Sequence, residues 1–484
     1  MPSATRGNTG SRPACNLSRP SPVAHDVDRR RAHSHAVSRF PSRASIGSIR
    51  RSWFARSVAR LWGAESLVAG MSFAQAALLA RWLGPRDYGV LALVMGYANV
   101  LYTFLDPRSS EAAVRYLGAF LEEERVDAAL ATTRLAYRVD VGVALVSFAA
   151  IAATSSWAAS QVVHDQTSAG LIALFALGLV LNSPHATSMA VLTSLGSFRL
   201  LARGRVATVA LRTGAVVALV AGGAGVTGAV AGTAVGLAVE GAVFTVLAHR
   251  TVTRHLGRAW WRAPRSALEG RRREIVRFIV YTDLISLVGA ATKQLDVVIL
   301  GYFRGPAHAG YYRLARSIAT MADRLVTPLQ AVAYPRFARL SDQPAPLFQL
   351  ARHYARRVGF PIGALAIACL PLLPFVLRQI VGSDFDRAAS TAQLLIAGAA
   401  VWVAFFWFRP LVLSLGEVRF RFVTALVVAV VSVVGFVVVA EPFGAPGVAM
   451  VQLVVGALGA NALAYAYLAR RYRPNLDSSF ERAG

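Results

Sequence analysis

Charged residues interrupt two long apolar stretches of this chain, residues 275–301 and 308–335. In the second stretch, Arg313, Arg316 and Arg324 fall on one side of a helix wound at about 100° per residue. An ionisable group at bilayer depth costs about 2.5–3.5 kcal/mol on insertion scales, so a retained one usually faces a cavity or a partner. A guanidinium group binds two phosphate oxygens at once, in bidentate fashion, and keeps its charge when partly desolvated. This stripe predicts a cavity that binds an anionic headgroup.

The first stretch carries Lys293 and Asp296, which lie three residues apart and can pair on a helix. Either the two neutralise each other inside the protein, or they form a switchable pair that substrate or a proton breaks. The predicted cavity of the second half leans cationic. Its substrate-binding cations are Lys293, Arg313, Arg316 and Arg324, set against Asp283, Asp296 and Asp323.

Acidic residues also lie in apolar stretches of the first half. Glu65 shares one side of a helix with Ser72 and Gln75, and Glu240 lies in a run of small residues suited to close helix packing. Glu240 could hold a proton or satisfy a neighbouring backbone group. Arg212 is expected at the interface, with its side chain snorkelling to water. The residues predicted to balance charge or to couple transport to a proton or sodium gradient are Glu65, Glu240, Asp283, Asp296 and Asp323.

The elements that must position these side chains are about a dozen apolar stretches, most of them long enough to cross a bilayer as helices. Hydrophobic residues make up 55% of the 484 residues, above the roughly 45–50% of soluble proteins. The gaps between the stretches are alternately rich and poor in arginine, and positive residues stay in the cytoplasm during insertion. The sequence predicts an all-α, polytopic cell-membrane protein with about 12 transmembrane helices and both termini in the cytoplasm.

The formal net charge of +26 raises the possibility of nucleic-acid binding. However, the basic residues are spread over short gaps and the N-terminal arm, where they act as topology signals beside an anionic leaflet. We therefore predict membrane lipids, and no nucleic acid, as partners. Phosphate-binding glycine loops, paired metal-ligand histidines and an HExxH motif are absent from the sequence. The prediction is a protein that is not an enzyme and that needs no metal and no cofactor.

The chain repeats a short turn. Gly84-Pro85 followed by Gly89 has a counterpart in Gly305-Pro306 followed by Gly310, 221 residues later and six apolar stretches further on. In each copy glycine permits a left-handed step, proline fixes φ, and the second glycine begins the next helix under a close neighbour. Because six is even, the halves share one orientation, which predicts two six-helix bundles related by an axis along the membrane normal, around a central cavity.

The predicted organisation has five parts. Residues 1–52 form a basic, disordered cytoplasmic tail or an over-extended start, and residues 471–484 form a second cytoplasmic tail. The predicted bundles cover residues 53–249 and 275–470, with a basic cytoplasmic linker at 250–274 between them.

Several segments resemble one family. The stretch from Leu79 to Gly89 is similar to the first hairpin of the polysaccharide transporter (oligosaccharide flippase) family, in the superfamily of multidrug extruders and lipid II flippases. Residues 295–312, 334–340 and 381–385 fit the same pattern in the same order, within a resemblance that covers about residues 55–470. It implies a flippase for a polyprenyl-pyrophosphate-linked oligosaccharide in cell-surface polysaccharide biosynthesis, working by alternating access beside polymerase and glycosyltransferase machinery.

Two alternatives stay open. A cation-coupled multidrug exporter of the same fold would use acidic cavity residues and act on soluble cations. A membrane glycosyl ligase or polymerase would need a large external loop, and the longest predicted external gap, residues 158–167, is short.

Overall fold

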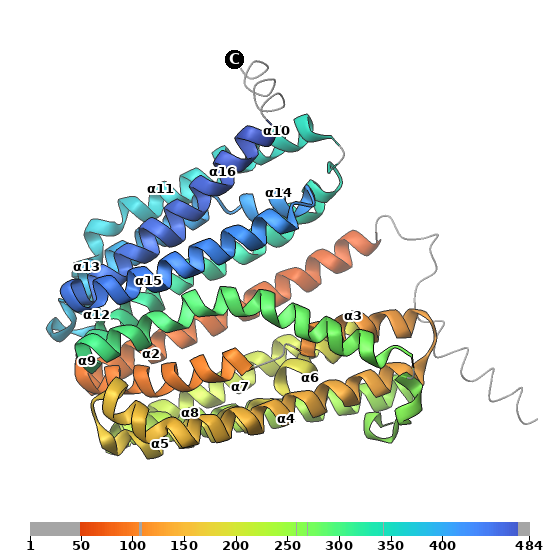
Figure 1. Ribbon diagram of the computed structural model, residues 1–484, viewed down its shortest axis with the longest axis horizontal. Coiled ribbons are helices and arrows are strands. Elements are labelled where there is room, and N and C mark those ends of the chain that lie inside the picture. Colours follow the sequence, from red (N-terminus) through yellow and green to blue (C-terminus); the bar gives the residue numbers. More distant parts are fainter. Residues whose placement is uncertain (1–48, 106–108, 258, 269, 342, 473–484) are drawn as a thin grey trace, which may run out of the picture. The chain divides into compact units, whose positions relative to one another are not determined.

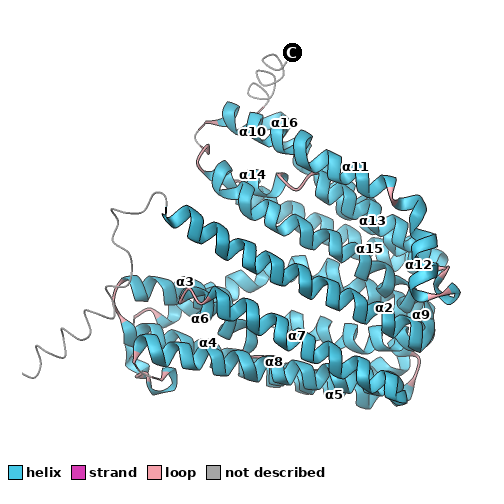
Figure 2. Cartoon of the chain, turned by 180° about the vertical axis from the view of Figure 1, so that it is seen from behind, coloured by secondary structure: helices cyan, strands magenta, loops and turns pink. Residues whose placement is uncertain are grey.

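The computed structural model describes residues 49–105, 109–257, 259–268, 270–341 and 343–472 (Figure 1). The chain divides into two units, Met1–Arg56 and Ser57–Gly484, and the description below concerns the second. Most of the predicted N-terminal tail, and the predicted C-terminal tail from residue 473, lie outside the described residues. All regular structure within the described residues is helical (Figure 2).

The first half runs from α2 to α8. Its helices are α2 (Ile49–Leu105), α3 (Ser109–Glu122), α4 (Val126–Ala158), α5 (Ala169–Asn182), α6 (His185–Ser194), α7 (Phe198–Leu219) and α8 (Gly225–Leu256). The second half consists of α9 (Arg272–Ala338), α10 (Pro344–Tyr354), α11 (Phe360–Ala368), α12 (Leu373–Val381), α13 (Ala388–Ala404), α14 (Phe408–Ser414), α15 (Val418–Val451) and α16 (Ala460–Arg471). Short 3₁₀ helices at Trp260–Arg262 and Arg265–Leu268 occupy the predicted linker.

The repeated turns break the two longest helices at equivalent places. Gly84 in α2 has φ +73° and ψ 173°, and Gly305 in α9 has φ +75° and ψ −177°. This region of backbone space is open essentially only to glycine. Each long helix is therefore two helices joined at a sharp bend, and the segments after the two bends pack on each other at Gly89 and Gly310.

Six helical segments among the described residues are long and apolar enough to cross a membrane. The pair α13 and α14, bent by 41°, makes a seventh. Large apolar side chains such as Leu365, Phe375 and Val438 are nearly two-thirds exposed on these segments. Apolar outer surfaces of this extent are expected where lipid replaces water as the solvent. The architecture is that of an all-helical polytopic membrane protein.

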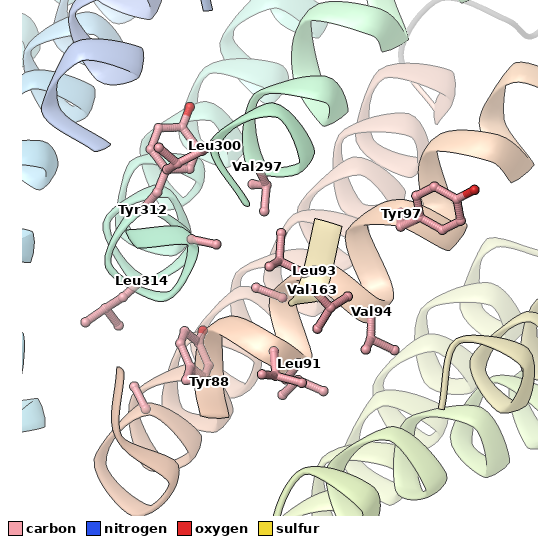
Figure 3. Packing of buried hydrophobic residues seen from close by; sticks show 14 of the residues in the cluster. Tyr88, Leu91, Leu93, Val94, Tyr97, Val163, Val297, Leu300, Tyr312 and Leu314 are labelled. Atoms are coloured by element: carbon pink, nitrogen blue, oxygen red, sulfur yellow. The ribbon is translucent and has the colours of Figure 1, made fainter. Parts of the chain in front are cut away.

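The largest apolar core joins the part of α2 that follows the bend at Gly84 to α9 (Figure 3). Leu93 of α2 and Leu300 of α9 are fully buried there. Leu93 packs on Gly301, where an added β-carbon would lie 2.2 Å from Leu93 Cδ2. The two halves are thus held together by the same helices that carry the repeated turns and several of the predicted cavity residues.

The segment after α2 forms the amphipathic helix α3. Its apolar face, which includes Ala112, Leu117 and Phe120, is buried against α4 and α6. Protein thus covers the apolar face of α3, because the ends of α4 and α6 supply matching apolar surfaces.

Candidate functional site

A central cavity of about 410 Å³ lies between the two halves. Three arginines line it, namely Arg212 from α7 and Arg313 and Arg316 from α9. The remaining polar lining consists of neutral side chains, whereas carboxylates are absent from the described lining. The neutral polar residues are Ser72, Gln75, Tyr88, Asn99, Thr233, Ser317 and Thr320, and the apolar ones include Leu79, Leu91, Phe175 and Leu237. The cavity is therefore suited to a ligand with negative charge and hydrogen-bonding groups.

Arg316 is anchored by a buried carboxylate. Its guanidinium forms an ion pair with Asp296, whose side chain is fully buried. The same carboxylate accepts hydrogen bonds from Tyr312 Oη at 2.7 Å and from the backbone N–H of Val297 at 2.8 Å, and a longer one from Gln452 Nε2 at 3.4 Å. Because these donors satisfy Asp296 from several sides, Arg316 is held at the cavity wall in one orientation.

Arg313 lies one helical turn from Arg316, beside the buried phenol of Tyr88. None of the described carboxylates forms an ion pair with Arg313. Among the described side chains, its positive charge is consequently the least compensated of the three in the cavity.

Arg212 was expected at the membrane interface, and this expectation is wrong. It lines the central cavity, and its Nη1 lies 3.0 Å from Glu240 Oε2 on α8. Glu240 is buried, and its other oxygen lies 3.6 Å from His185 Nε2. The partner that draws Arg212 inward is thus Glu240, one turn beyond the close contact of Arg212 with Gly236.

Glu65 is placed differently from its predicted neighbours. Ser72 and Gln75 line the cavity, whereas Glu65 forms an ion pair with Arg205 Nε at 2.6 Å between partly exposed side chains. Glu65 is not part of the cavity lining, because it lies two turns before Ser72 along α2.

Four further predicted residues lie on α9, and their side chains are outside the described set. These residues are Asp283, Lys293, Asp323 and Arg324. The pairing expected between Lys293 and Asp296 is outside it for the same reason. Within the described part of the chain, no group of three or more His, Cys, Asp or Glu side chains could hold a metal ion.

One known protein family matches most of the chain. Residues 78–390 match the family described as polysaccharide biosynthesis protein. The chain belongs to this family. The resemblance drawn from the repeated turns and their flanking segments is therefore confirmed. No curated protein matches the sequence.

Several solved structures of transporters share the fold of this chain. A structure of the lipid II flippase MurJ in an inward closed conformation aligns with a TM-score of 0.63 and 10% identity, covering 84% of this chain and 87% of that one. An inward-facing multidrug resistance MATE transporter of the MOP superfamily gives a TM-score of 0.59 at 13% identity, over 87% and 96% of the chains. The MATE transporter VcmN of Vibrio cholerae in its bent form gives 0.56 at 11%, over 88% and 98%. The fold is that of the MOP transporters.

Proposed function

We propose that this protein moves a polyprenyl-pyrophosphate-linked oligosaccharide from the cytoplasmic to the external leaflet of the cell membrane. The observation that carries the proposal is a central cavity lined by three arginines and no described carboxylate, in a polysaccharide biosynthesis protein with a transporter fold. Arginine binds two phosphate oxygens in bidentate fashion and stays charged when partly desolvated. A cationic drug would be repelled by the positive charge of these arginines.

The proposed topology has twelve crossings. Glycines with positive φ break four helical segments, α2, α7–α8, α9 and α15–α16, and each of these supplies two crossings. Four others, α4, α5–α6, α10–α12 and α13–α14, supply one each. The basic gaps support a cytoplasmic location for both termini, and the repeated turns support two parallel six-helix bundles at residues 53–249 and 275–470.

Transport in this scheme uses the cavity for the headgroup alone. The polyprenol tail stays in the bilayer, while the charged and sugar-bearing headgroup crosses through a polar path that lowers its transfer cost. Rocking of one half against the other about the packed turns would expose the cavity to each side in turn. Arg313 is proposed to bind the pyrophosphate most directly, with Arg316 and Arg212 completing the anion site.

The charged residues whose side chains are undescribed fit the same scheme. Lys293 and Arg324 are proposed as further cations, and Asp283 and Asp323 as charge balance, together with Glu65. Polymerase and glycosyltransferase machinery would act on the same glycolipid before and after it crosses.

The test is headgroup accessibility in a deletion strain with no redundant transporter. Labelled polyprenyl-linked oligosaccharide is probed from outside with an impermeant reagent, with the wild-type gene or an Arg212→Gln/Arg313→Gln/Arg316→Gln variant supplied in trans. We expect inaccessible glycolipid to accumulate in the deletion strain, and to clear with the wild type and not with the variant. The matched control is Arg254→Gln, at an exposed position at the end of α8.

Two results would overturn the proposal. One is unchanged accessibility in the deletion strain. The other is full rescue by the triple variant. If the deletion instead sensitised cells to cationic compounds, the multidrug exporter would replace the flippase as the proposed function.

A further inference from the structure

Three ionisable side chains connect the central cavity to a second cavity in the first half. Arg212 lines the central cavity and bonds to Glu240 Oε2 at 3.0 Å. Glu240 Oε1 in turn lies 3.6 Å from His185 Nε2, which has no hydrogen-bond partner among the described residues. His185 lines the second cavity, of about 110 Å³. A change of charge at His185 can therefore reach the central cavity through one carboxylate.

The second cavity is polar. Asp140 accepts a hydrogen bond from Ser109 Oγ there, and both side chains are buried. The buried side-chain oxygens of Asn182 and Ser183 have no protein partner in the described structure. A cavity with several such atoms is a place where water binds. Protons could thus reach His185 from the side facing away from the substrate.

The groups around His185 come from several helices. Glu240 of α8 is the nearest, while Arg205 and Arg212 of α7 and Asp140 of α4 also face it. Phe244 packs edge-on against the imidazole, with the ring centroids 4.7 Å apart. Arg205 is engaged with Glu65. Glu240 is therefore the carboxylate that a protonated His185 would approach.

Packing limits how Arg212 can respond. An added β-carbon at Gly236 would lie 2.3 Å from Arg212 Cγ and 2.6 Å from its Cβ, so the stem of the side chain rests on the face of α8. The guanidinium is then the part that can turn between Glu240 and a ligand in the cavity. Glu240 and an anionic ligand are competitors for the same guanidinium.

We propose that His185 and Glu240 form a proton site linked to anion binding at Arg212, so that each anion bound takes up about one proton. When the anion draws Arg212 away, the buried Glu240 carboxylate loses its partner, and a buried unpaired charge is strongly disfavoured. Protonation of the His185–Glu240 pair restores neutrality. Because linkage is reciprocal, lower pH strengthens anion binding. This inference rests on the proposed anion site.

The experiment is calorimetric titration of the purified full-length protein with a water-soluble, short-chain prenyl pyrophosphoryl sugar. Both phosphates of this probe are esterified, so its own charge is constant near neutral pH. Titrations in two buffers of different ionisation enthalpy give the number of protons taken up per anion. For the wild type we expect uptake approaching one proton, with affinity rising by up to about tenfold per unit fall in pH where the pair titrates.

Variants separate a proton site from a merely structural cluster. His185→Gln should bind the probe with little pH dependence and little proton uptake. Glu240→Gln should bind it tightly at every pH, because Arg212 is released permanently. His308→Gln, at a partly buried histidine of α9 that packs beside Gly444 of α15, should keep the wild-type slope. Wild-type proton uptake in both His185→Gln and Glu240→Gln would overturn the proposal.

The same titration distinguishes this inference from the proposed function. If the wild type binds the probe, and Arg313→Gln weakens that binding, while proton uptake is zero, the proton site alone fails. If the wild type does not bind the probe at any pH, the anion site itself fails.

Discussion

Gly89 of α2 lies against the backbone of Pro306 in α9, so closely that an added β-carbon would stand 1.7 Å from the Pro306 carbonyl oxygen. The contact has a reciprocal copy, in which a β-carbon at Gly310 would stand 2.2 Å from the carbonyl oxygen of Pro85. Each repeated turn thus provides both a glycine face and the carbonyl that packs on the other copy. The two halves meet here through backbone, with no room for a side chain.

Gly89→Ala should therefore force the halves apart at this contact. Overpacking in a rigid core typically costs about 1–3 kcal/mol, and here the obstructing atom is backbone, which cannot rotate away. We expect a lower melting temperature and greater reactivity of a thiol placed in the cavity by Ser317→Cys, with Cys15 and Cys369 replaced by serine. The thiol reagent is applied from the side of the packed turns, the proposed external face.

The matched control is Gly142→Ala on α4, where a β-carbon meets no atom within 4 Å. That variant should keep the wild-type thiol reactivity. Equal reactivity and equal melting temperature for Gly89→Ala and Gly142→Ala would show that the contact of the turns does not hold the halves together.

The repeat was readable from sequence because its chemistry is local. A single Gly-Pro pair followed by glycine is a weak signal, but two copies 221 residues apart at matched positions predict equivalent sharp turns with a close approach. The structure has both features, at Gly84 and Gly305 for the turn and at Gly89 and Gly310 for the approach. The stripe containing Arg313 and Arg316 was readable for the same reason, because helical periodicity is local.

The sequence did not predict which charged residues far apart in the chain pair with each other. The spacing of three residues offered Lys293 as a partner of Asp296, but nothing in the sequence pointed to Arg316, twenty residues along the chain, which does pair with Asp296. The position of Arg212 depends on Glu240 and on the bare face of Gly236, neither of which is adjacent in sequence. Sequence gives the side of a helix on which a charge lies, and packing decides which other helix meets that side.

Arg313 and Arg316 should respond differently to the same substitution. Arg313→Gln removes a charge that no described carboxylate pairs, so it should weaken headgroup binding with little loss of stability. A hydrogen bond to a charged group contributes about 1.5–3 kcal/mol, so the expected loss is about 10–100-fold in affinity. Arg316→Gln should weaken binding and also lower stability, because it strands the fully buried Asp296.

The measurement is probe affinity and melting temperature for both variants, with Arg316→Gln/Asp296→Asn as the internal control. Removing both charges should recover stability relative to Arg316→Gln while leaving binding weak. If Arg313→Gln proved the more destabilising of the two single variants, the assignment of Arg316 as the anchored arginine would be wrong.

Gly84 is required for a reason unlike that of Gly89. Nothing lies within 4 Å of a β-carbon built at Gly84, yet its φ of +73° is one that L side chains rarely adopt. Gly84→Ala should consequently cost about 1–3 kcal/mol through backbone strain alone. Thermal unfolding of Gly84→Ala beside Gly142→Ala measures this cost, since the control has open space and an ordinary backbone. A melting temperature equal to that of the control would contradict the strained turn.

Acid should loosen the contact between the start of α15 and the end of α16 through Glu417. Its carboxylate accepts hydrogen bonds from Tyr467 Oη at 2.7 Å and Tyr472 Oη at 3.2 Å, and lies 2.7 Å from Arg471 Nε. The bond from Tyr467, followed by that from Tyr472 and the charge of Arg471, lowers the pKa of Glu417 below its usual value. A group with a lowered folded pKa contributes stability above its unfolded pKa, about 4.3 for glutamate. That stability is lost as pH falls through the folded pKa.

Tyr467→Phe removes the first of these causes and keeps the ring that stacks on Phe420 at 3.8 Å. We expect the variant to melt at a lower temperature than the wild type at neutral pH. The difference should shrink as pH falls from about 4.3 through the lowered folded pKa of Glu417, below which this carboxyl is protonated in both proteins. Tyr465→Phe, at an exposed ring two residues away, should match the wild type throughout. A difference between wild type and Tyr467→Phe that stayed constant across this range would mean that the phenol stabilises α16 independently of the charge on Glu417.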